Sequence, residues 1–337
     1  MRKTTMAGIA AALFLATSSA PALAQDRPVL TVYTYDSFTA DWGPGPAIEK
    51  AFEAQCACDL VWVGLDSSVG ILTRLKLEGQ AAKADIALGL DHFWSTEAAR
   101  TGLFAAHGQN TSSLNLPGGW QDTIFLPVDY GFFAFVYNKE KLAKPPASLK
   151  ALVEDAQGPS VVIQDPRSST PGMGLLVWMQ SVFGDGTEAA WKALSPRIVS
   201  ATKDWSDAYG LFLEGEADMV LSYTTSPAYH RIAEKDDRFA AARFAEGHVM
   251  QIETAAKLKA APNPQLADRF LAFLLTDGFQ DKVATGNWMY PVKLPAAGLP
   301  EGFDTPLSAD AVRAVDPARI DAERKGWTEE WLRALAR

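Results

Sequence analysis

The sequence predicts a mixed α/β protein with two lobes, each built on a parallel-rich sheet. Strand-like runs alternate with helix-like segments in two parts of the chain, and repeated βα units are typical of parallel sheets covered by helices. Residues 124–138 and 239–253 are extended without a helical period, so we expect them to carry the chain between the lobes. Two lobes joined by crossing strands enclose a cleft that can close by hinge motion.

The first lobe is predicted from alternating apolar strands and helix-start signals. The expected strands and helices lie at residues 29–35 (strand), 48–55 (helix), 60–63 (strand), behind Asp66-Ser67-Ser68 (helix) and 85–90 (strand). Ligands of parallel sheets bind beyond the carboxyl ends of the strands. The loops after Tyr35, Val63 and Leu90 are therefore expected to gather at the cleft.

The second lobe is predicted to repeat this alternation. Its expected elements are strands at 161–164, 198–201 and 219–223, helices from Pro171, Ser206 and Pro227, and a C-terminal helix with Trp327 and Trp331. A helix or helix pair over 266–279 is expected after the chain has returned to the first lobe. Residues 124–138 are expected to form two extended pieces around Asp129-Tyr130-Gly131. The expected division assigns 25–126 and about 246–285 to lobe I, and 127–245 and about 286–337 to lobe II.

The N-terminus has the pattern of a cleavable export signal. Arg2 and Lys3 precede a short apolar run over residues 7–16, and Ala22-Leu23-Ala24 matches an A-x-A cleavage signal. Residues 1–24 are therefore the expected signal peptide. The apolar run is shorter than the roughly 20 residues that span a bilayer, and no cysteine precedes Cys56 for a lipid anchor. We expect the mature chain to be exported and not inserted in a membrane.

Charge and cysteine usage exclude several classes of function. Removal of the signal changes the formal net charge from −9 to −11, which argues against nucleic acid and anionic membrane surfaces. Two cysteines and four scattered histidines give no recognisable metal site, and no cofactor is indicated. Export permits a Cys56–Cys58 disulfide, but the ring is very small, so the pattern leaves the bond open. A local clip is favoured over a redox or metal role.

Hydroxyl-rich helix starts are the first candidate binding features. Ser168-Ser169-Thr170-Pro171 and Thr224-Thr225-Ser226-Pro227 each place hydroxyls at the cap position before a proline. A helix N-terminus offers free N–H groups and partial positive charge, so it can hold an anion or a polar group. Plain capping explains each start as well. Ser67 and Ser68 are a third candidate, facing from the first lobe.

Aromatic residues occupy the same strand-to-helix junctions. Tyr35, Trp205, Tyr223 and Tyr229 lie there, where a ring can stack on a heteroaromatic or cover a cation. Packing at the lip of the cleft is the alternative. Possible carboxylate partners are Asp36, Asp91 and Asp129, and Arg167 is expected to form a local or interlobe salt bridge. A flat cation with a polar or phosphorylated tail would use all of these groups.

Several long stretches resemble one known family. They are LTVYTYDSFTADWGPGP, KADIALGLD, LPVDYGFFAFVYNKEKL, IQDPRSSTPGMGLLVWMQ, YGLFLEGEADMVLSYTTSPAYH and TGNWMYPV. The chain is similar to the periplasmic thiamine-binding proteins of ABC importers, which have the type II periplasmic binding-protein fold. The resemblance implies ligand binding by Tyr35, Ser169, Thr170, Trp205, Tyr223, Thr224, Thr225, Ser226 and Tyr229. An acidic residue followed by glycine is the family pattern where this chain has Ser67-Ser68.

The resemblance also implies partners and a compartment. We expect thiamine or a thiamine phosphate as the ligand, a membrane permease and its ATPase as partners, the periplasm as the location, and a monomer. Cys-x-Cys is a feature of the family, which supports the clip. A ferric-ion binder of the same fold is one alternative, but adjacent tyrosines with histidine are missing from the candidate loops. A thiamine-degrading enzyme is another, and no catalytic constellation supports it.

Overall fold

The computed structural model describes residues 27–313 and 315–336, so the expected signal peptide lies outside the described residues. Its strands are β1 (Val29–Tyr35), β2 (Asp59–Leu65), β3 (Ile86–Asp91), β4 (Leu126–Asn138), β5 (Val161–Gln164), β6 (Ile198–Thr202), β7 (Met219–Tyr223), β8 (Phe239–Ala241), β9 (His248–Lys257), β10 (Tyr290–Pro291) and β11 (Val312–Arg313). The order across the main sheet path is β2-β1-β3-β9-β4-β7-β5-β6. Parallel pairs at both ends of this path confirm the mixed α/β prediction.

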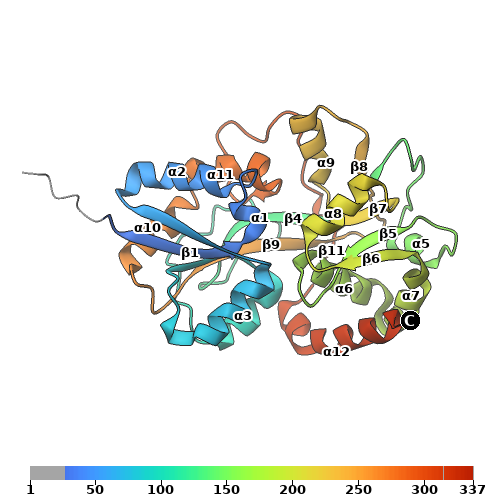
Figure 1. Ribbon diagram of the computed structural model, residues 1–337, viewed down its shortest axis with the longest axis horizontal. Helices are drawn as coiled ribbons and strands as arrows, with labels where there is room; N and C mark the ends of the chain where they lie inside the picture. Colours follow the sequence, from blue (N-terminus) through green and yellow to red (C-terminus); the bar gives the residue numbers. More distant parts are fainter. Residues whose placement is uncertain (1–26, 314, 337) are drawn as a thin grey trace, which may run out of the picture.

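The helices flank the two ends of this path (Figure 1). They are α1 (Asp36–Thr39), α2 (Gly45–Cys56), α3 (Ser68–Glu78), α4 (Ser95–Arg100), α5 (Leu149–Glu154), α6 (Thr170–Phe183), α7 (Thr187–Leu194), α8 (Trp205–Glu214), α9 (Ser226–Tyr229), α10 (Pro264–Phe273), α11 (Asp277–Lys282) and α12 (Pro317–Leu335). We call the group around β1, β2 and β3 the first half, and the group around β5, β6 and β7 the second half. No helix in the described part of the chain is long and apolar enough to cross a membrane.

Strand β4 belongs to both halves. Leu126 to Phe132 pair with β9, and Phe133 to Tyr137 pair with β7. The segment is extended and passes from one half to the other, as predicted, but it is one continuous strand and not two pieces around Asp129-Tyr130-Gly131. A Cβ at Gly131 would lie 2.7 Å from the Met289 methyl group, so glycine leaves room for Met289 beside the strand.

Alternate residues of β1 show how each face of the sheet is covered. Leu30 and Val32 are fully buried in a cluster with residues of α2 and α10, whereas Tyr33 packs in the cluster that contains residues of α3. Side chains alternate between the two faces of a strand, so the VLTVYTY pattern requires helices on both faces. Figure 1 shows the helices that lie on the two sides of β1.

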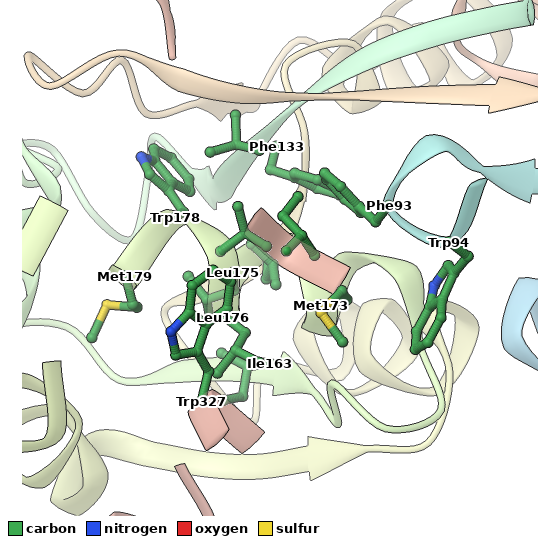
Figure 2. Packing of buried hydrophobic residues seen from close by; sticks show 14 of the residues in the cluster. Phe93, Trp94, Phe133, Ile163, Met173, Leu175, Leu176, Trp178, Met179 and Trp327 are labelled. Carbon is green, nitrogen blue, oxygen red and sulfur yellow. The ribbon is translucent and has the colours of Figure 1, made fainter. Parts of the chain in front are cut away.

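The second half is built around α6, which is almost entirely buried. Figure 2 shows Met173 and Leu176 of this helix beside Ile163 of β5 and Trp327 of α12. A helix that is apolar on all sides must be covered on all sides, and α12 supplies one of the covering surfaces. Helix α12 also contacts α4 from the first half, where Arg324 pairs with Glu97.

The two cysteines form a disulfide at the end of α2. Ala57 between them adopts a left-handed conformation with φ 52°, and Arg269 donates to the carbonyl oxygens of Gln55 and Cys56. The bond left open by the sequence pattern is therefore present, and it closes the helix end as a local clip.

Candidate ligand-binding cleft

A cavity of about 820 Å³ opens between the two halves. The first half contributes the ends of β1 and β2 and the start of α3, and the second half contributes the starts of α6 and α8 and the end of β7. These are the carboxyl ends of parallel strands, as expected for an α/β sheet. The charged side chains lining the cavity are five carboxylates and one lysine: Asp36, Asp66, Asp204, Asp207, Glu253 and Lys203.

Most of the sequence-predicted site residues come together on this cavity. Those that line it are Tyr35, Ser67, Ser68, Ser169, Thr170, Trp205, Tyr223, Ser226 and Tyr229. Thr224 and Thr225 do not line it, because both are fully buried beneath the end of β7. Arg167 forms a local ion pair with Asp165 at 2.5 Å, as predicted.

Trp205 is fixed by contacts on its edge and on its face. It is the first residue of α8, whose N-cap Asp204 accepts a hydrogen bond from the backbone N–H of Asp207. The indole Nε1 donates to Ser222 Oγ at 2.8 Å, and the ring stacks on Tyr209 with centroids 4.9 Å apart. The indole is thus held in one orientation at the cavity wall.

Ser226 supports this arrangement from below the cavity wall. Its Oγ lies 2.7 Å from Ser222 Oγ and accepts a hydrogen bond from the backbone N–H of Tyr223 at 3.2 Å. The predicted helix from Pro227 is confirmed: α9 begins at Ser226 and continues as a π-helical segment over His230–Glu234, although Thr225 makes no side-chain cap bond. The Thr-Thr-Ser-Pro pattern therefore orders the end of β7 and its contact with Trp205.

The other two helix starts differ from each other. Ser67 caps α3 by accepting from the backbone N–H of Gly70 at 3.2 Å. Ser169 is the N-cap residue of α6 but makes no side-chain cap bond, so the alternative of plain capping does not hold for its hydroxyl. The neighbouring Thr170 donates to Asp91 Oδ2 at 2.6 Å instead. The hydroxyl of Ser169 therefore remains available at the start of a 14-residue helix.

Two tyrosines of the cavity donate to polar groups of β9. Tyr35 donates to Glu253 Oε2 at 2.9 Å, and Tyr223 donates to Gln251 Oε1 at 2.6 Å. Burial raises the pKa of both hydroxyls well above the usual value, so both tyrosines keep their protons at neutral pH. Their rings are neutral, electron-rich surfaces.

Sequence reasoning did not find the floor and the outer edge of the cavity. The residues missed are Gln251, Glu253, Asn287, Trp42, Trp288 and Met289. Trp288 meets Tyr229 edge to face at 5.3 Å, and Trp42 is 60% exposed at the opening. The stretch TGNWMYPV, which carries part of the family resemblance, contained the signal for Asn287 and Trp288.

Three acidic side chains lie in a row under the cavity. Asp91 of β3 and Asp129 of β4 each stand opposite Glu253 of β9 in the register of the sheet. Asp91 also accepts from the backbone N–H of Phe93, and Asp129 accepts from Asn287 Nδ2 at 2.8 Å. All three are buried, and burial raises the pKa of Asp91 to about 7.

Comparison with known proteins identifies the family. Residues 39–281 match the model of the bacterial extracellular solute-binding proteins. The chain belongs to this family. The structure of iron-bound HitA from Pseudomonas aeruginosa superposes on this solute-binding protein with a TM-score of 0.75 at 18% identity, over 90% of this chain and 99% of that one. The predicted type II periplasmic binding-protein fold is confirmed.

More similar relatives cover nearly the full length of this solute-binding protein. The thiamine-binding periplasmic protein of Escherichia coli is 53% identical over 92% of this chain and 94% of its own. That of Haemophilus influenzae is 44% identical over 98% of each chain. A solved structure described as a periplasmic thiamin binding protein superposes with a TM-score of 0.88 at 53% identity, over 92% of this chain and 97% of that one.

Replacing Gly89 by alanine is expected to destabilise the fold next to the cavity. Gly89 has φ +90°, and a Cβ there would lie 2.5 Å from two ring atoms of Tyr35. We expect the free energy of unfolding, measured with urea, to fall by about 1–3 kcal/mol. Gly186→Ala is the control, because a Cβ at Gly186 meets nothing within 4 Å. Equal stability of both variants and the wild type would contradict the expectation.

Proposed function

We propose that this solute-binding protein captures thiamine or a thiamine phosphate in the cavity between its halves. The observation that carries the proposal is the combination of aromatic rings and carboxylates on one cavity, which Trp205, Tyr223 and Glu253 all line. Thiamine consists of a flat aminopyrimidine and a thiazolium ring with a permanent positive charge. The relatives named thiamine-binding periplasmic proteins, at 44–53% identity, support the same ligand.

The rings and the acids have complementary roles in this proposal. Faces of Trp205, Tyr223 and Tyr35 stack on the two heterocycles, and a cation over an aromatic face gains about 0.5–2 kcal/mol. The predominance of carboxylates over the single lining lysine favours a positively charged ligand. Tyr229 and Trp288 close the outer end of the ring-binding region.

The hydroxyethyl or phosphate tail is assigned to the helix starts. The N-terminus of α6 carries the hydroxyl of Ser169, and the N-terminus of α3 carries Ser67 and Ser68. Free N–H groups at these positions can donate hydrogen bonds to an alcohol oxygen or a phosphate oxygen, and the helix dipole favours a negative charge there. Thr170, Thr224, Thr225 and Ser226 support the cavity wall in this proposal.

The remaining expectations are also proposals. A signal peptide at residues 1–24 delivers the protein to the periplasm, where a monomer passes its ligand to an ABC permease driven by an ATPase. The lobes follow the division at residues 25–126 with about 246–285, and 127–245 with about 286–337. A thiamine-degrading activity would need a reactive cysteine in the cavity, whereas Cys56 and Cys58 form the disulfide at the end of α2.

Isothermal titration calorimetry with thiamine, its monophosphate and its diphosphate tests the ligand assignment. We expect saturable binding of thiamine with one site per chain, because one cavity carries both the rings and the acids. Ferric iron is the comparison ligand, and it should give no tyrosinate charge-transfer band, since the described residues contain no cluster of His, Cys, Asp and Glu suited to a metal ion, and Tyr35 and Tyr223 are hydrogen-bonded to Glu253 and Gln251. Iron binding without thiamine binding would overturn the proposal.

A further inference from the structure

The carboxylate row formed by Asp91, Glu253 and Asp129 crosses three neighbouring strands. Glu253 on the middle strand stands directly opposite both aspartates. Directly opposed residues of antiparallel strands project to the same face with Cβ atoms about 4.5–5.5 Å apart, and like charges in such positions are destabilising. Glu253 lines the cavity, Asp91 reaches its wall through Thr170, and Asp129 reaches it through Asn287.

No neighbouring side chain neutralises the carboxylate row. In residues 27–313 and 315–336, no lysine, arginine or histidine forms an ion pair with any of its three members. The Oδ1 atom of Asp129 is buried without a hydrogen-bond partner in the same part of the chain. Three buried negative charges at this spacing would repel one another strongly. The carboxylate row therefore favours the binding of a positive charge.

The titratable groups that face the row do not supply this positive charge. They are Tyr35 from β1, Tyr223 from β7, His92 after β3 and Arg324 from α12, with Asp36, Asp66, Lys203, Asp204 and Asp207 around the rim. Burial lowers the pKa of His92 to about 4, so its ring is neutral. Arg324 pairs with Glu97 and Asp321; its charge lowers the pKa of Asp91, but burial has the larger effect, so the net pKa is raised. Lys203 is nearest to Asp204 at 3.8 Å.

A bound proton can supply the positive charge that the neighbouring side chains do not supply. Burial, followed by the charge of Asp129, raises the pKa of Glu253 well above its usual value, and burial also raises the pKa of Asp129. Raised pKa values mean that the row binds protons in the empty protein that it would not bind in the unfolded chain. A fixed positive charge beside Glu253 favours the ionised form and releases the proton.

We propose that the carboxylate row is the charge-selecting element of the cleft: it holds a proton when the cleft is empty and exchanges that proton for the positive charge of the ligand. The inference rests on the proposed binding of thiamine. It adds a role for residues outside the aromatic wall, which is formed by Trp205, Tyr223 and Tyr35. Glu253 is the specificity-determining member, because it is the one that lines the cavity. Ligand affinity then rises with pH through the range in which the row loses its proton.

The test compares thiamine with its neutral thiophene isostere, which has the same shape without the fixed charge. Calorimetric titrations at about pH 7, in two buffers with different ionisation enthalpies, give the number of protons released on binding. For the wild type we expect about one proton released with thiamine and a clearly smaller release with the isostere. In Glu253→Gln, the preference for thiamine over the isostere should fall ten-fold or more, with loss of the proton release.

Glu78→Gln is the matched control. Glu78 also accepts a hydrogen bond from a tyrosine hydroxyl, Tyr33 at 3.0 Å, but does not line the cavity. Its ligand preference and proton release should equal those of the wild type. If Glu253→Gln does not fold, Asp129→Asn replaces it and should reduce proton release in the same direction. Unchanged preference and proton release in the tested variant would overturn the inference while leaving thiamine binding intact. Absence of thiamine binding to the wild type would instead overturn the proposed function.

Discussion

Replacing Trp205 by alanine is expected to weaken thiamine binding ten-fold or more, which corresponds to about 1.4 kcal/mol or above. The indole lies on the cavity wall, held by its bond to Ser222 and its stacking on Tyr209, so no reorganisation is needed before it stacks on the ligand. Tyr223→Ala should have a similar effect, because its ring faces the same cavity. Calorimetric titration with thiamine measures both.

Trp120→Ala separates ligand contact from general destabilisation. Trp120 is half-buried and donates its Nε1 hydrogen bond to the carbonyl oxygen of Phe125 at 2.8 Å, but it does not line the cavity. Its thiamine affinity should stay near that of the wild type. Wild-type affinity in both Trp205→Ala and Tyr223→Ala would refute the aromatic wall as the ring-binding surface.

Replacing Gly174 by alanine is expected to lower the free energy of unfolding by about 3 kcal/mol, at the upper end of the usual cost of overpacking. A Cβ on Gly174 would lie 2.1–2.5 Å from three ring atoms of Phe133. The Phe133 ring is fully buried beside Phe93 at 6.3 Å and Tyr223 at 5.2 Å. It cannot move without displacing Tyr223 from the cavity wall, so thiamine binding should weaken as well.

Urea unfolding followed by circular dichroism measures this loss of stability. Gly326→Ala is the matched control, because Gly326 is also inside a helix and a Cβ there meets nothing within 4 Å. Without a clash, alanine should raise the free energy of unfolding by about 0.5–1 kcal/mol through its higher helix propensity. A stabilised Gly174→Ala variant would show that the contact between α6 and β4 is looser than described.

Local sequence patterns predicted a strand well where that strand keeps the same partner strands along its whole length. Strands β1, β5 and β7 begin and end at the predicted residues, because their apolar runs are bounded by clear turn or cap residues. Strand β4 was missed as a unit because Asp129 and Gly131 are typical of turns. In the fold, Asp129 belongs to the buried carboxylate row, and the absence of a side chain at Gly131 leaves room for Met289.

The sequence predicted much of the cavity wall and, with Asp91 and Asp129, two of the three buried carboxylates beneath it, but not Glu253 between them. Trp205 and Tyr223 stand at strand-to-helix junctions, a position that can be read from neighbouring residues alone. Glu253 alternates with apolar residues in β9, which is also the pattern of an ordinary solvent-facing strand. Its contact with Tyr35 spans 218 positions in the chain, so no local pattern contains it.

The strand shared by both halves limits how the protein can move. Sliding one half past the other would break the ladder of β4 with β9 or with β7, whereas a small change of twist near Phe132 and Phe133 keeps both ladders intact. Opening and closing should therefore be a bend about this strand and not a shear. Asp129 lies within a few residues of that bending point, so we expect a change in the angle between the halves to move a carboxylate of the cleft floor.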